Sequence, residues 1–221
     1  LFGPPGAGKG TQGYHLAKEF NLYNISTGDL LREEVKKKND LSKKINLLIN
    51  EGKLVSDEII KDLIKNIISN KKFTNKLIFD GYPRNLNQAK TLDLLLKKFN
   101  QNISFVFNIK VDQDIVTKRI LGRQTCSKCG SIFNKFFNPA TSINHNCDEK
   151  FLVTRLDDNE TIISKRYEVY TNQTLPILEY YNNQNLLHEI DGMVDFTMIF
   201  NEISGIIKSL EAWLYNMYLY K

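Results

Sequence analysis

The sequence predicts an α/β domain, a parallel β-sheet with helices packed on it, on three observations. Short apolar runs alternate with longer stretches of helical period, which is typical of strands joined by crossover helices. Residues 77–79 and 105–107 are apolar at every position, as strands buried on both faces of a sheet require. A Gly-rich loop at residues 3–11 separates the end of a strand from an amphipathic helix, an order typical of phosphate-binding loops.

The elements are expected in a fixed order along the chain. Strands are predicted just before Gly3 and at residues 23–26, 76–79, 103–109 and 186–190. Helices are predicted at residues 9–20, 28–38, 41–51, 57–70, 86–99, 112–121, 160–181 and from 196 to about 215. Ser56 and Asp112 are the expected N-caps of their helices, and Pro176 predicts a kink or break in the helix that contains it.

Composition limits the class of protein. The chain has 221 residues, of which 42% are hydrophobic and 25% charged, and these values exclude a disordered or collagen-like protein. Its net charge of +5 fits an anionic small molecule, nucleic acid or a membrane surface, and does not choose among them. No apolar run approaches the ~18 residues of a membrane span and no signal peptide is visible, so we expect a cytoplasmic protein. Because Leu1 and Phe2 have the pattern of a strand end, we also expect residues before them, and a mitochondrial location is the alternative.

Two segments interrupt the alternation of strands and helices. Residues 30–70 carry helical patterns alone, whereas residues 123–158 have no helical period, so we expect one helical and one β-rich insertion. The second segment holds all three cysteines. Three is too few for a disulfide framework, and an odd number cannot be fully paired. The C-x2-C spacing of Cys126 and Cys129 is typical of a metal knuckle or a redox pair.

The Gly-rich loop carries the strongest functional signal. Its glycines let backbone N–H groups point at a phosphate, and the following helix N-terminus adds partial positive charge. Lys9 supplies a mobile positive charge for the β- and γ-phosphates, although Gly10 stands where the general pattern has Ser or Thr. The loop reads Gly3-Pro4-Pro5-Gly6-Ala7-Gly8-Lys9-Gly10-Thr11.

Two further motifs follow expected strands. Asp80 ends a buried strand, where phosphate-binding α/β proteins hold Mg²⁺ directly or through water, and Arg84 leaves the same edge of the sheet. Residues 26–32 form a second strand-to-helix turn, with hydroxyls that can bind a base and Arg32 one turn later. Four more arginines bracket the cysteine segment and indicate a clamp for a polyphosphate: Arg119, Arg123, Arg155 and Arg166.

With these residues in hand, the chain resembles the adenylate kinase family of nucleoside monophosphate kinases nearly from end to end. The family's phosphate loop itself has a glycine after the lysine, which accounts for Gly10. The matching elements are GxPGxGKGT at residues 3–11, STGDLLR at 26–32, Lys-Leu-Val at 53–55, Asp-Gly-Tyr-Pro-Arg at 80–84, the acceptor-base position at Gln88, Gly-Arg at 122–123 and Arg-x-Asp-Asp at 155–158.

The resemblance implies the architecture of the whole chain. It implies a P-loop NTPase core with a five-stranded parallel sheet flanked by helices, made of residues 1–26, 76–122 and 159–221. Residues 27–75 would be a helical AMP-binding insertion, and residues 123–158 a small β-rich lid. Closure of both parts would exclude water, which otherwise competes with AMP for the phosphoryl group.

The resemblance also implies a role for each matched residue. Thr27, Val55 and Gln88 would contact the adenine of AMP, Arg119 would stack on the donor base, and Asp80 would orient hydrated Mg²⁺. The donor site would comprise Gly6, Ala7, Gly8, Lys9, Gly10, Thr11, Arg119, Arg123 and Met193. The AMP site would comprise Thr27, Arg32, Lys53, Val55, Gly81, Arg84, Gln88, Arg155 and Arg166. The catalytic groups would be Lys9, Arg84, Arg123, Arg155 and Arg166, with Asp157 fixing the arginine geometry.

The resemblance leaves the lid metal open. Cys147 stands where the family's zinc-bearing lids have a third ligand after Cys126 and Cys129, but the family's fourth position is occupied by Lys150, which cannot bind zinc. His145, Asp148 or Glu149 could each complete four-coordination. The alternative is a knuckle without Zn²⁺, in a lid held by hydrogen bonds and by apolar packing of Ile132, Phe133, Phe136 and Phe137.

Several functions are compatible with these features. We expect a monomeric enzyme that transfers a phosphoryl group from ATP to AMP and has no nucleic-acid or membrane partner. GTP, which some members of the family use, is the alternative donor. The resemblance implies that donor choice depends on the region of Arg119 and on backbone groups at residues 191–194, which leave little trace in side chains. A remote alternative is a nucleotide-gated zinc-ribbon module that binds nucleic acid, although the basic residues match phosphate-binding positions rather than forming one stripe.

Overall fold

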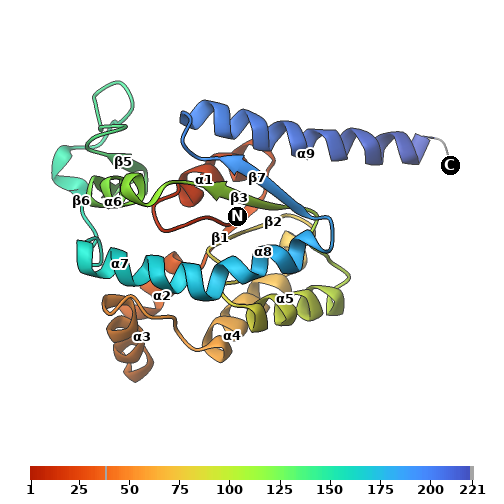
Figure 1. Cartoon of the computed structure of the whole chain (residues 1–221), viewed down its shortest axis with the longest axis horizontal. Coiled ribbons are helices and arrows are strands. Elements are labelled where there is room, and N and C mark those ends of the chain that lie inside the picture. Colours follow the sequence, from red (N-terminus) through yellow and green to blue (C-terminus); the bar gives the residue numbers. More distant parts are fainter. Residues whose placement is uncertain (38, 220–221) are drawn as a thin grey trace.

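A computed structural model describes residues 1–37 and 39–219, with side chains described up to Ser209 (Figure 1). Two parallel strand pairs form the centre of the molecule. β1 (Tyr23–Ser26) pairs with β2 (Leu77–Asp80), and β3 (Val106–Lys110) pairs with β7 (Leu187–Asp191). Four consecutive residues of β3 are buried, as expected for a strand covered on both faces.

The first two residues lie between the strand pairs. Phe2 bridges β3 in the parallel direction, and its carbonyl oxygen accepts from the N–H of Ile109 at 2.9 Å. The nitrogen of Leu1 donates to the carbonyl oxygen of Phe79 in β2 at 2.7 Å. The predicted first strand is therefore present as a single β-bridge to β3. The Gly-rich loop, which follows it, starts between the two strand pairs.

Helices cover both sides of these strands. α1 (Lys9–Glu19) and α9 (Phe196–Leu219) lie on one side, and α5 (Leu86–Lys98) and α8 (Leu175–Asn182) lie on the other (Figure 1). Each side has its own apolar core. The first core includes Leu16, Ile120, Ile163, Ile199 and Ile203. The second includes Phe2, Ala89, Val106, Ile177 and Tyr181.

The chain between β1 and β2 is helical, as predicted. It contains α2 (Thr27–Lys36), α3 (Asp40–Asn50), α4 (Asp57–Ile68) and the short 3-10 helix η1 (Lys71–Phe73). The buried face of α4 is formed by Ile60, Ile64 and Ile68, which are spaced four residues apart and so share one face. The predicted end of the second helix at Lys38 lies outside the described residues.

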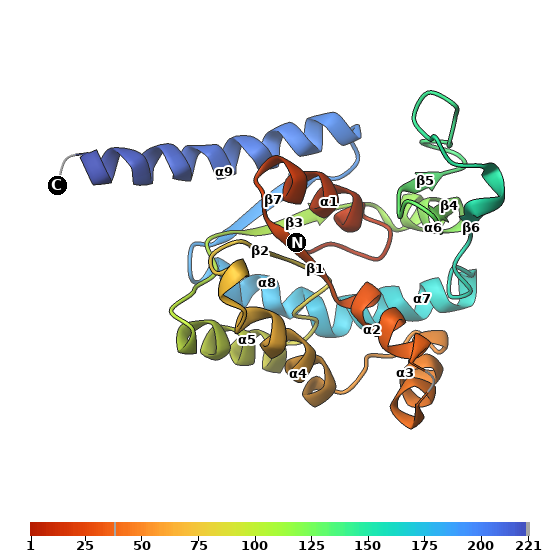
Figure 2. The same ribbon diagram turned by 180° about the vertical axis from the view of Figure 1, so that it is seen from behind.

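The cysteine segment forms a small antiparallel sheet in the order β5-β4-β6, visible beside α6 (Gln113–Leu121) in Figure 2. The strands are β4 (Arg123–Cys126), β5 (Ile132–Asn134) and β6 (Leu152–Val153). α7 (Glu160–Val169) runs between this sheet and the helices of residues 27–75. A Cβ at Gly52, after α3, would lie 3.4 Å from Ile162 and 3.5 Å from Arg166, so the helical insertion rests against α7.

Helix ends confirm some predictions and correct others. The predicted helix 160–181 is divided by a π-helical turn, η3 (Tyr170–Thr174), directly before α8 and its Pro176. Ser56 and Asp112 occupy N-cap positions as predicted, but neither side chain accepts a capping hydrogen bond from any residue that the structure describes.

Within residues 1–37 and 39–219, no helix is both long enough and apolar enough to cross a membrane.

Candidate functional site

The Gly-rich loop wraps around its own lysine. Lys9, the first residue of α1, donates from Nζ to the carbonyl oxygens of Gly3 (2.7 Å) and Pro4 (2.8 Å). Burial is the largest influence on the pKa of Lys9 and lowers it to about 8. The loop passes very close to α6, because a Cβ at Gly6 (φ +80°) would lie 2.7 Å from Cγ1 of Ile120. Only glycine fits this position. The tight path of the loop keeps its carbonyl oxygens close to the Lys9 ammonium group.

The register of β1 and β2 brings two predicted motifs together. Ser26 and Asp80, the last residues of the two strands, are paired neighbours. The residues that follow are therefore close as well, and Thr27 donates from Oγ1 to the carbonyl oxygen of Gly81 at 2.8 Å. The phosphate loop also reaches this edge, since a Cβ at Gly10 would lie 3.4 Å from Oδ2 of Asp80. The carboxylate of Asp80 thus lies where the two strand ends meet the loop.

Arg84 is held by backbone groups. Its Nε donates to the carbonyl oxygen of Gly81 at 2.8 Å, and its own carbonyl oxygen accepts from Oγ1 of Thr174 at 2.9 Å. Thr174 is the last residue of the π-helical turn η3, and such turns are frequent at functional sites. Burial, followed by the positive charge of Arg166, lowers the pKa of the Arg84 guanidinium.

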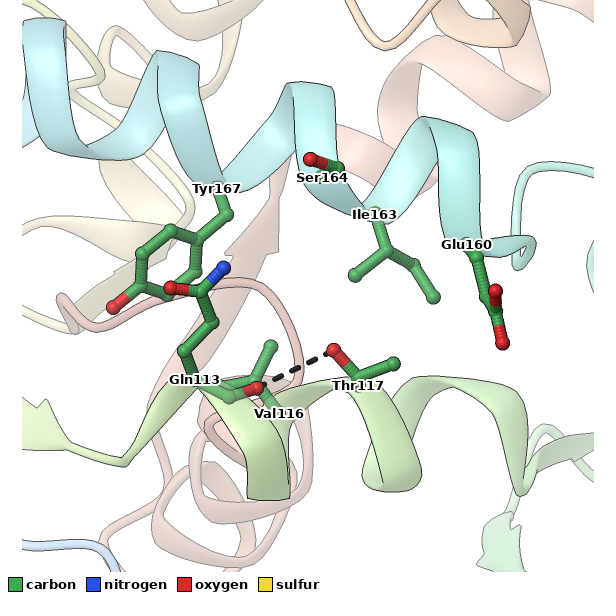
Figure 3. Close-up of a pocket in the computed structure, with 7 residues that line it drawn as sticks. All are labelled: Gln113, Val116, Thr117, Glu160, Ile163, Ser164 and Tyr167. Atoms are coloured by element: carbon green, nitrogen blue, oxygen red, sulfur yellow. Dashed lines mark hydrogen bonds between the residues drawn. The ribbon is translucent and has the colours of Figure 1, made fainter.

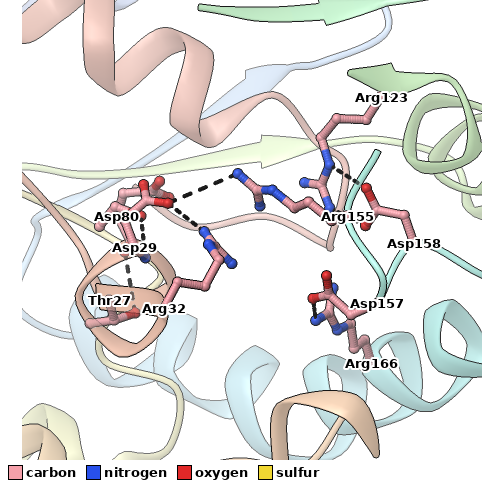
Figure 4. Close-up of polar contacts among 10 residues, drawn as sticks. Thr27, Asp29, Arg32, Asp80, Arg123, Arg155, Asp157, Asp158 and Arg166 are labelled. Carbon is pink, nitrogen blue, oxygen red and sulfur yellow. Dashed lines mark hydrogen bonds and ion pairs between the residues drawn. The ribbon is translucent and has the colours of Figure 1, made fainter. Parts of the chain in front are cut away.

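Two arginines on the lid side are held by carboxylates instead (Figure 4). Arg123 donates from Nε to Oδ2 of Asp158 at 2.8 Å and makes a second contact to the same carboxylate from Nη2. The side chain of Asp158 is 0% exposed, so this two-point pair is removed from water. Arg166 on α7 pairs with Asp157. Burial acts to raise the pKa of Asp157, but the charge and hydrogen bond of Arg166 outweigh it and lower that pKa.

Asp29 lies between two further arginines (Figure 4). Its Oδ1 is 2.5 Å from Nη2 of Arg32 on the same helix and 4.0 Å from Nη2 of Arg155 in the segment after β6. Burial and the charges of Arg123 and Arg32 lower the pKa of Arg155 to about 10. One carboxylate therefore contacts arginines from the helical insertion and from the lid side.

These groups form one cluster with an excess of positive charge. Bidentate guanidinium groups in excess over carboxylates suit a polyphosphate, whose oxygens they can bind in a fixed geometry. The cationic members are Lys9, Arg32, Arg84, Arg123, Arg155 and Arg166. The carboxylates among them are Asp29, Asp80, Asp157 and Asp158.

Three other predicted site residues lie at the margin of this cluster. The guanidinium of Arg119 is 5.9 Å from the ring centre of Phe137, and burial lowers its pKa. Met193, half-exposed between β7 and α9, has its N–H bonded to Asp191 at 2.8 Å. The side chain of Lys53 is 66% exposed and pairs with Glu51, so the structure does not bring it into the cluster.

A hollow between α6 and α7 is separate from this cluster (Figure 3). It encloses about 150 Å³, and Gln113, Thr117 and Tyr167 are among its lining residues. Nucleotide-sized ligands need pockets of roughly 300–1,000 Å³. None of the arginines in the cluster lines it, so we do not assign it to a nucleotide.

The phosphate loop starts from a central array of strands, and arginines lie at the edge where these strands end. This arrangement is typical of P-loop enzymes. Comparison of sequences identifies the family. A sequence model described as adenylate kinase matches residues 1–186. The chain belongs to the adenylate kinase family. An adenylate kinase of Pelagibacter ubique (strain HTCC1062) is 46% identical over 208 residues, which are 94% of this chain and 98% of that protein. Adenylate kinases of Methanocella arvoryzae and Thermosipho melanesiensis are 41% and 39% identical, over 95% and 94% of this chain and 98% of each of those proteins.

Membership of the adenylate kinase family confirms the main predictions. The fold is a P-loop α/β fold, and the chain is an enzyme, a nucleoside monophosphate kinase that transfers a phosphoryl group from a nucleotide to AMP. Adenylate kinases use Mg²⁺ with the nucleotide. The motifs that carry the resemblance lie at residues 3–123 and 155–158. All of them fall within the part of the chain that the family model matches.

The three cysteines of residues 123–158 lie beside a histidine. The ligand atoms of Cys126, Cys129, His145 and Cys147 all lie within 4.8 Å of one another. The Nε2 atom of His145 is buried and has no hydrogen-bond partner among the residues that the structure describes. Three thiolates and one imidazole are a ligand set of structural zinc sites, so the residues present fit the metal.

The other two candidates for a fourth ligand lie elsewhere. Asp148 pairs with Lys150 at 3.0 Å, and neither it nor Glu149 belongs to the cysteine–histidine group among the described residues. Apolar packing is a weak alternative to the metal, because Phe136 and Phe137 are 67% and 52% exposed. Phe133 is buried, and its ring packs 4.8 Å from that of His145.

Three carboxylates of the site escaped the sequence analysis. Asp158 was part of a matched motif but received no role, Asp29 lay inside another, and Asp57 was noted only as a helix-start residue. In the structure each accepts hydrogen bonds or ion pairs from predicted site residues. For Asp29 and Asp158 the usable signal was an acidic residue inside an arginine-containing motif, whereas no local pattern pointed to Asp57.

Proposed function

We propose that this enzyme transfers the γ-phosphoryl group of ATP to AMP and forms two diphosphates. The observation that carries the proposal is the convergence of six cationic side chains on one region beside the phosphate loop. A transferring phosphoryl group spreads negative charge over its oxygens, so catalysis is mostly positioning and neutralisation. The shared name of the relatives, adenylate kinase, supports an adenine nucleotide as a substrate.

On the donor side, the phosphate loop would hold the triphosphate. The N–H groups of residues 6–11 and the ammonium of Lys9 would bind the phosphates after Lys9 exchanges its bonds to Gly3 and Pro4. Arg119, with Met193 at the turn after β7, would contact the donor base. Asp80 would orient the water shell of Mg²⁺, whose charge screens the phosphates when it is bound.

On the acceptor side, the turn after β2 would hold AMP. Arg84 and Arg32 would bind its phosphate, and Thr27, Val55, Gly81 and Gln88 would contact its adenine. Lys53 would contribute backbone groups alone, because its side chain is exposed. Arg123, Arg155 and Arg166 would neutralise the group in transfer, with Asp157 and Asp158 orienting two of these arginines.

We also propose the division of the chain that the sequence predicts. Residues 27–75 would be the AMP-binding insertion and residues 123–158 the lid, and α7 contacts the first and carries Arg166. Leu1 and Phe2 would join the two strand pairs into one five-stranded parallel sheet, which their bonds to Phe79 and Ile109 support. Because every group named comes from one chain, the enzyme would act as a monomer.

A structural Zn²⁺ in the lid completes the proposal. Cys126, Cys129, His145 and Cys147 would hold it, and its chemistry there would be to tie β4 to the loop before β6. The N–H of Cys129 already points at the sulfur of Cys126 at 3.5 Å, and Gly130 takes φ +76° in the same tight turn. Metal analysis of purified, chelator-free protein should give about one zinc per chain, and less than ~0.2 per chain would contradict this site.

A donor panel tests the proposed reaction. Purified enzyme and AMP are mixed with ATP, GTP, ITP or CTP, and diphosphate formation is followed. We expect kcat/KM for ATP to exceed that for GTP by at least about tenfold, because a base contact worth one good hydrogen bond gives that factor. A preference for GTP would replace the donor but keep the reaction, and no diphosphate from any donor would overturn the proposed function.

A further inference from the structure

The side-chain amide of Gln88 is held at both ends. Gln88 is 3% exposed and lies in the first turn of α5. Its Oε1 accepts from the backbone N–H of Arg84 at 2.8 Å, and its Nε2 donates to Oδ1 of Asp57 at 2.7 Å. Turning the amide over would place oxygen against a carboxylate and nitrogen against an N–H. The two partners therefore fix which end of the amide is the donor.

Asp57 is itself held by three amides. Its Oδ1 also accepts from Nδ2 of Asn85 at 3.0 Å, and its Oδ2 accepts from Nδ2 of Asn87 at 2.8 Å. Burial acts to raise the pKa of Asp57, but the bonds from Asn87, Asn85 and Gln88 outweigh it and lower that pKa. An ionised carboxylate can only accept, so all three amides must present their NH₂ groups to it.

The carboxylate of Asp57 contacts the start of a neighbouring helix. Asp57 is the first residue of α4, where Asp is favoured by the helix dipole. Its carboxylate is turned across to the start of α5, where Asn85 is the N-cap and bonds the N–H of Gln88 at 2.8 Å. The first turn of α5 is thus fixed by its own cap and by a carboxylate from the helical insertion.

We propose that Asp57 is a positioning residue for recognition of the acceptor base, because it fixes the orientation of the Gln88 amide. The inference rests on the proposed contact of Gln88 with the adenine of AMP. With its present partners, Gln88 keeps one further N–H on Nε2 and one further lone pair on Oε1.

That remaining pair matches adenine. The adenine edge offers an acceptor at N1 and a donor at the 6-amino group, which complement an amide N–H and an amide oxygen. Hypoxanthine has the opposite pattern, a donor at N1 and an acceptor at position 6, and would require the amide to be turned over. A carboxylate at position 57 therefore makes the site selective for AMP over IMP. An asparagine there can donate or accept, so one of the two contacts that fix the amide is lost and only the N–H of Arg84 still favours the present orientation.

The test compares AMP and IMP as acceptors with ATP as donor, in four proteins. These are the wild type, Asp57→Asn, Gln88→Ala and the double variant. For Asp57→Asn we expect the ratio of kcat/KM for AMP to that for IMP to fall about tenfold, chiefly through a higher KM for AMP, with a much smaller effect on kcat. In the Gln88→Ala background the same substitution should change the ratio by less than about twofold, because the residue through which it acts is gone.

A matched control removes the same charge from the same helix. Asp62 is an exposed residue of α4, and Asp62→Asn should leave the AMP-to-IMP ratio within about twofold of the wild type. If Gln88→Ala lowers the ratio and Asp57→Asn does not, the role of Asp57 is wrong and the proposed AMP site stands. If Gln88→Ala itself has no effect, the proposed contact of Gln88 with adenine is wrong.

The bond between Gln88 and Asp57 can also be measured in the wild-type enzyme. With the Gln88 side chain assigned through its own covalent bonds, the NH₂ proton that faces Asp57 should lie downfield of the range of exposed glutamine amides in the nucleotide-free enzyme, because it is bonded to a carboxylate at 2.7 Å. Asp57→Asn should move this resonance back toward that range. Wild-type Gln88 NH₂ signals at the positions of exposed glutamines would overturn the inference.

Discussion

The two sides of the arginine cluster hold their guanidinium groups in different ways. On the acceptor side, Arg84 bonds a backbone carbonyl oxygen, that of Gly81. On the lid side, Arg123 and Arg166 bond the carboxylates of Asp158 and Asp157. A carbonyl group keeps its place when the arginine is removed, but a buried carboxylate is left as an unpaired charge. Loss of Arg84 should therefore affect catalysis alone, whereas loss of Arg123 or Arg166 should affect catalysis and stability together.

Arg84→Ala sets the reference for this difference. We expect kcat to fall at least ~100-fold, because a cation that would position the accepting phosphate of AMP is lost. The melting temperature should change by less than about 5 °C, since the lost bond is to a backbone carbonyl and the variant also relieves repulsion with Arg166. Steady-state kinetics and thermal melts of the same preparation measure both quantities.

Arg123→Ala should lose as much activity and, unlike Arg84→Ala, a large part of its stability. Asp158 is fully buried and would lose its ion-pair partner, at a cost of about 3–5 kcal/mol. For a chain of this size that lowers the melting temperature by roughly 6–20 °C.

A double variant separates the two effects of Arg123. In Arg123→Ala/Asp158→Asn the buried charge is gone, so stability should return toward that of the wild type while kcat stays low. Equal melting temperatures for Arg84→Ala and Arg123→Ala would contradict the proposed difference between the two sides.

The phosphate loop adds a pH dependence that neither group of arginines should show. In the nucleotide-free enzyme the pKa of Lys9 is lowered to about 8, so Lys9 loses its proton as the pH rises through that value. A triphosphate binds the protonated form, and its Kd should therefore rise by up to about tenfold per pH unit above pH 8. Below pH 8 the lysine is charged and Kd should be flat with respect to this group.

Folding stability should respond to Lys9 in the opposite sense. The unfolded chain keeps this proton up to about pH 10.4, so between pH 8 and that value it binds more protons than the folded enzyme. The contribution of Lys9 to stability therefore increases with pH across this window. Lys9→Arg keeps a permanent charge and serves as the control, and an unchanged pH profile of Kd in that variant would contradict the assignment.

Removal of a proposed zinc ligand should affect the proposed lid without affecting the proposed AMP site. His145→Ala should lower the zinc content and reduce the melting temperature by about 5–10 °C, while KM for AMP stays within about twofold. Asp148→Asn, at a residue outside the cysteine–histidine group, should keep both zinc and stability. Loss of zinc in the Asp148 variant would assign the fourth ligand differently.

The smallest effect is expected at Lys53. Its side chain makes a surface pair with Glu51, and such pairs contribute about 0–1 kcal/mol. Lys53→Ala should therefore change KM for AMP and kcat by less than about twofold. A larger rise in KM for AMP would show that this side chain moves into the acceptor site when nucleotide binds.

The sequence predicts much of the fold because the relevant physics is local. Apolar runs such as Phe105-Val106-Phe107 mark buried strands, and carboxyl ends of parallel strands share one edge, so the motifs after β1 and β2 had to meet. Pro176, which cannot donate a backbone hydrogen bond, predicts in the same way the irregular turn η3 that lies directly before α8. The family motifs then place Lys9 and Arg84 in one site.

Local sequence patterns do not predict contacts between side chains of distant segments. Asp157 and Asp158 are adjacent in sequence, yet one pairs with Arg166 and the other with Arg123, 35 residues away. The direction of each side chain is set by how the lid segment packs, which depends on the whole fold. The N-caps show the same limit, because Asn85 caps α5 with its side chain whereas Ser56 occupies the equivalent position of α4 without such a bond to any described residue.

The contact of Gly52 with α7 has a consequence for how the two substrates influence each other. Gly52 (φ +71°) lies against Ile162 and Arg166, so the loop of the helical insertion is in direct contact with the helix that carries Arg166. If binding of one substrate shifts this contact, the free energy of the shift enters the binding of the other substrate as well. By thermodynamic reciprocity, whatever factor AMP adds to the affinity for the donor, the donor must add to the affinity for AMP.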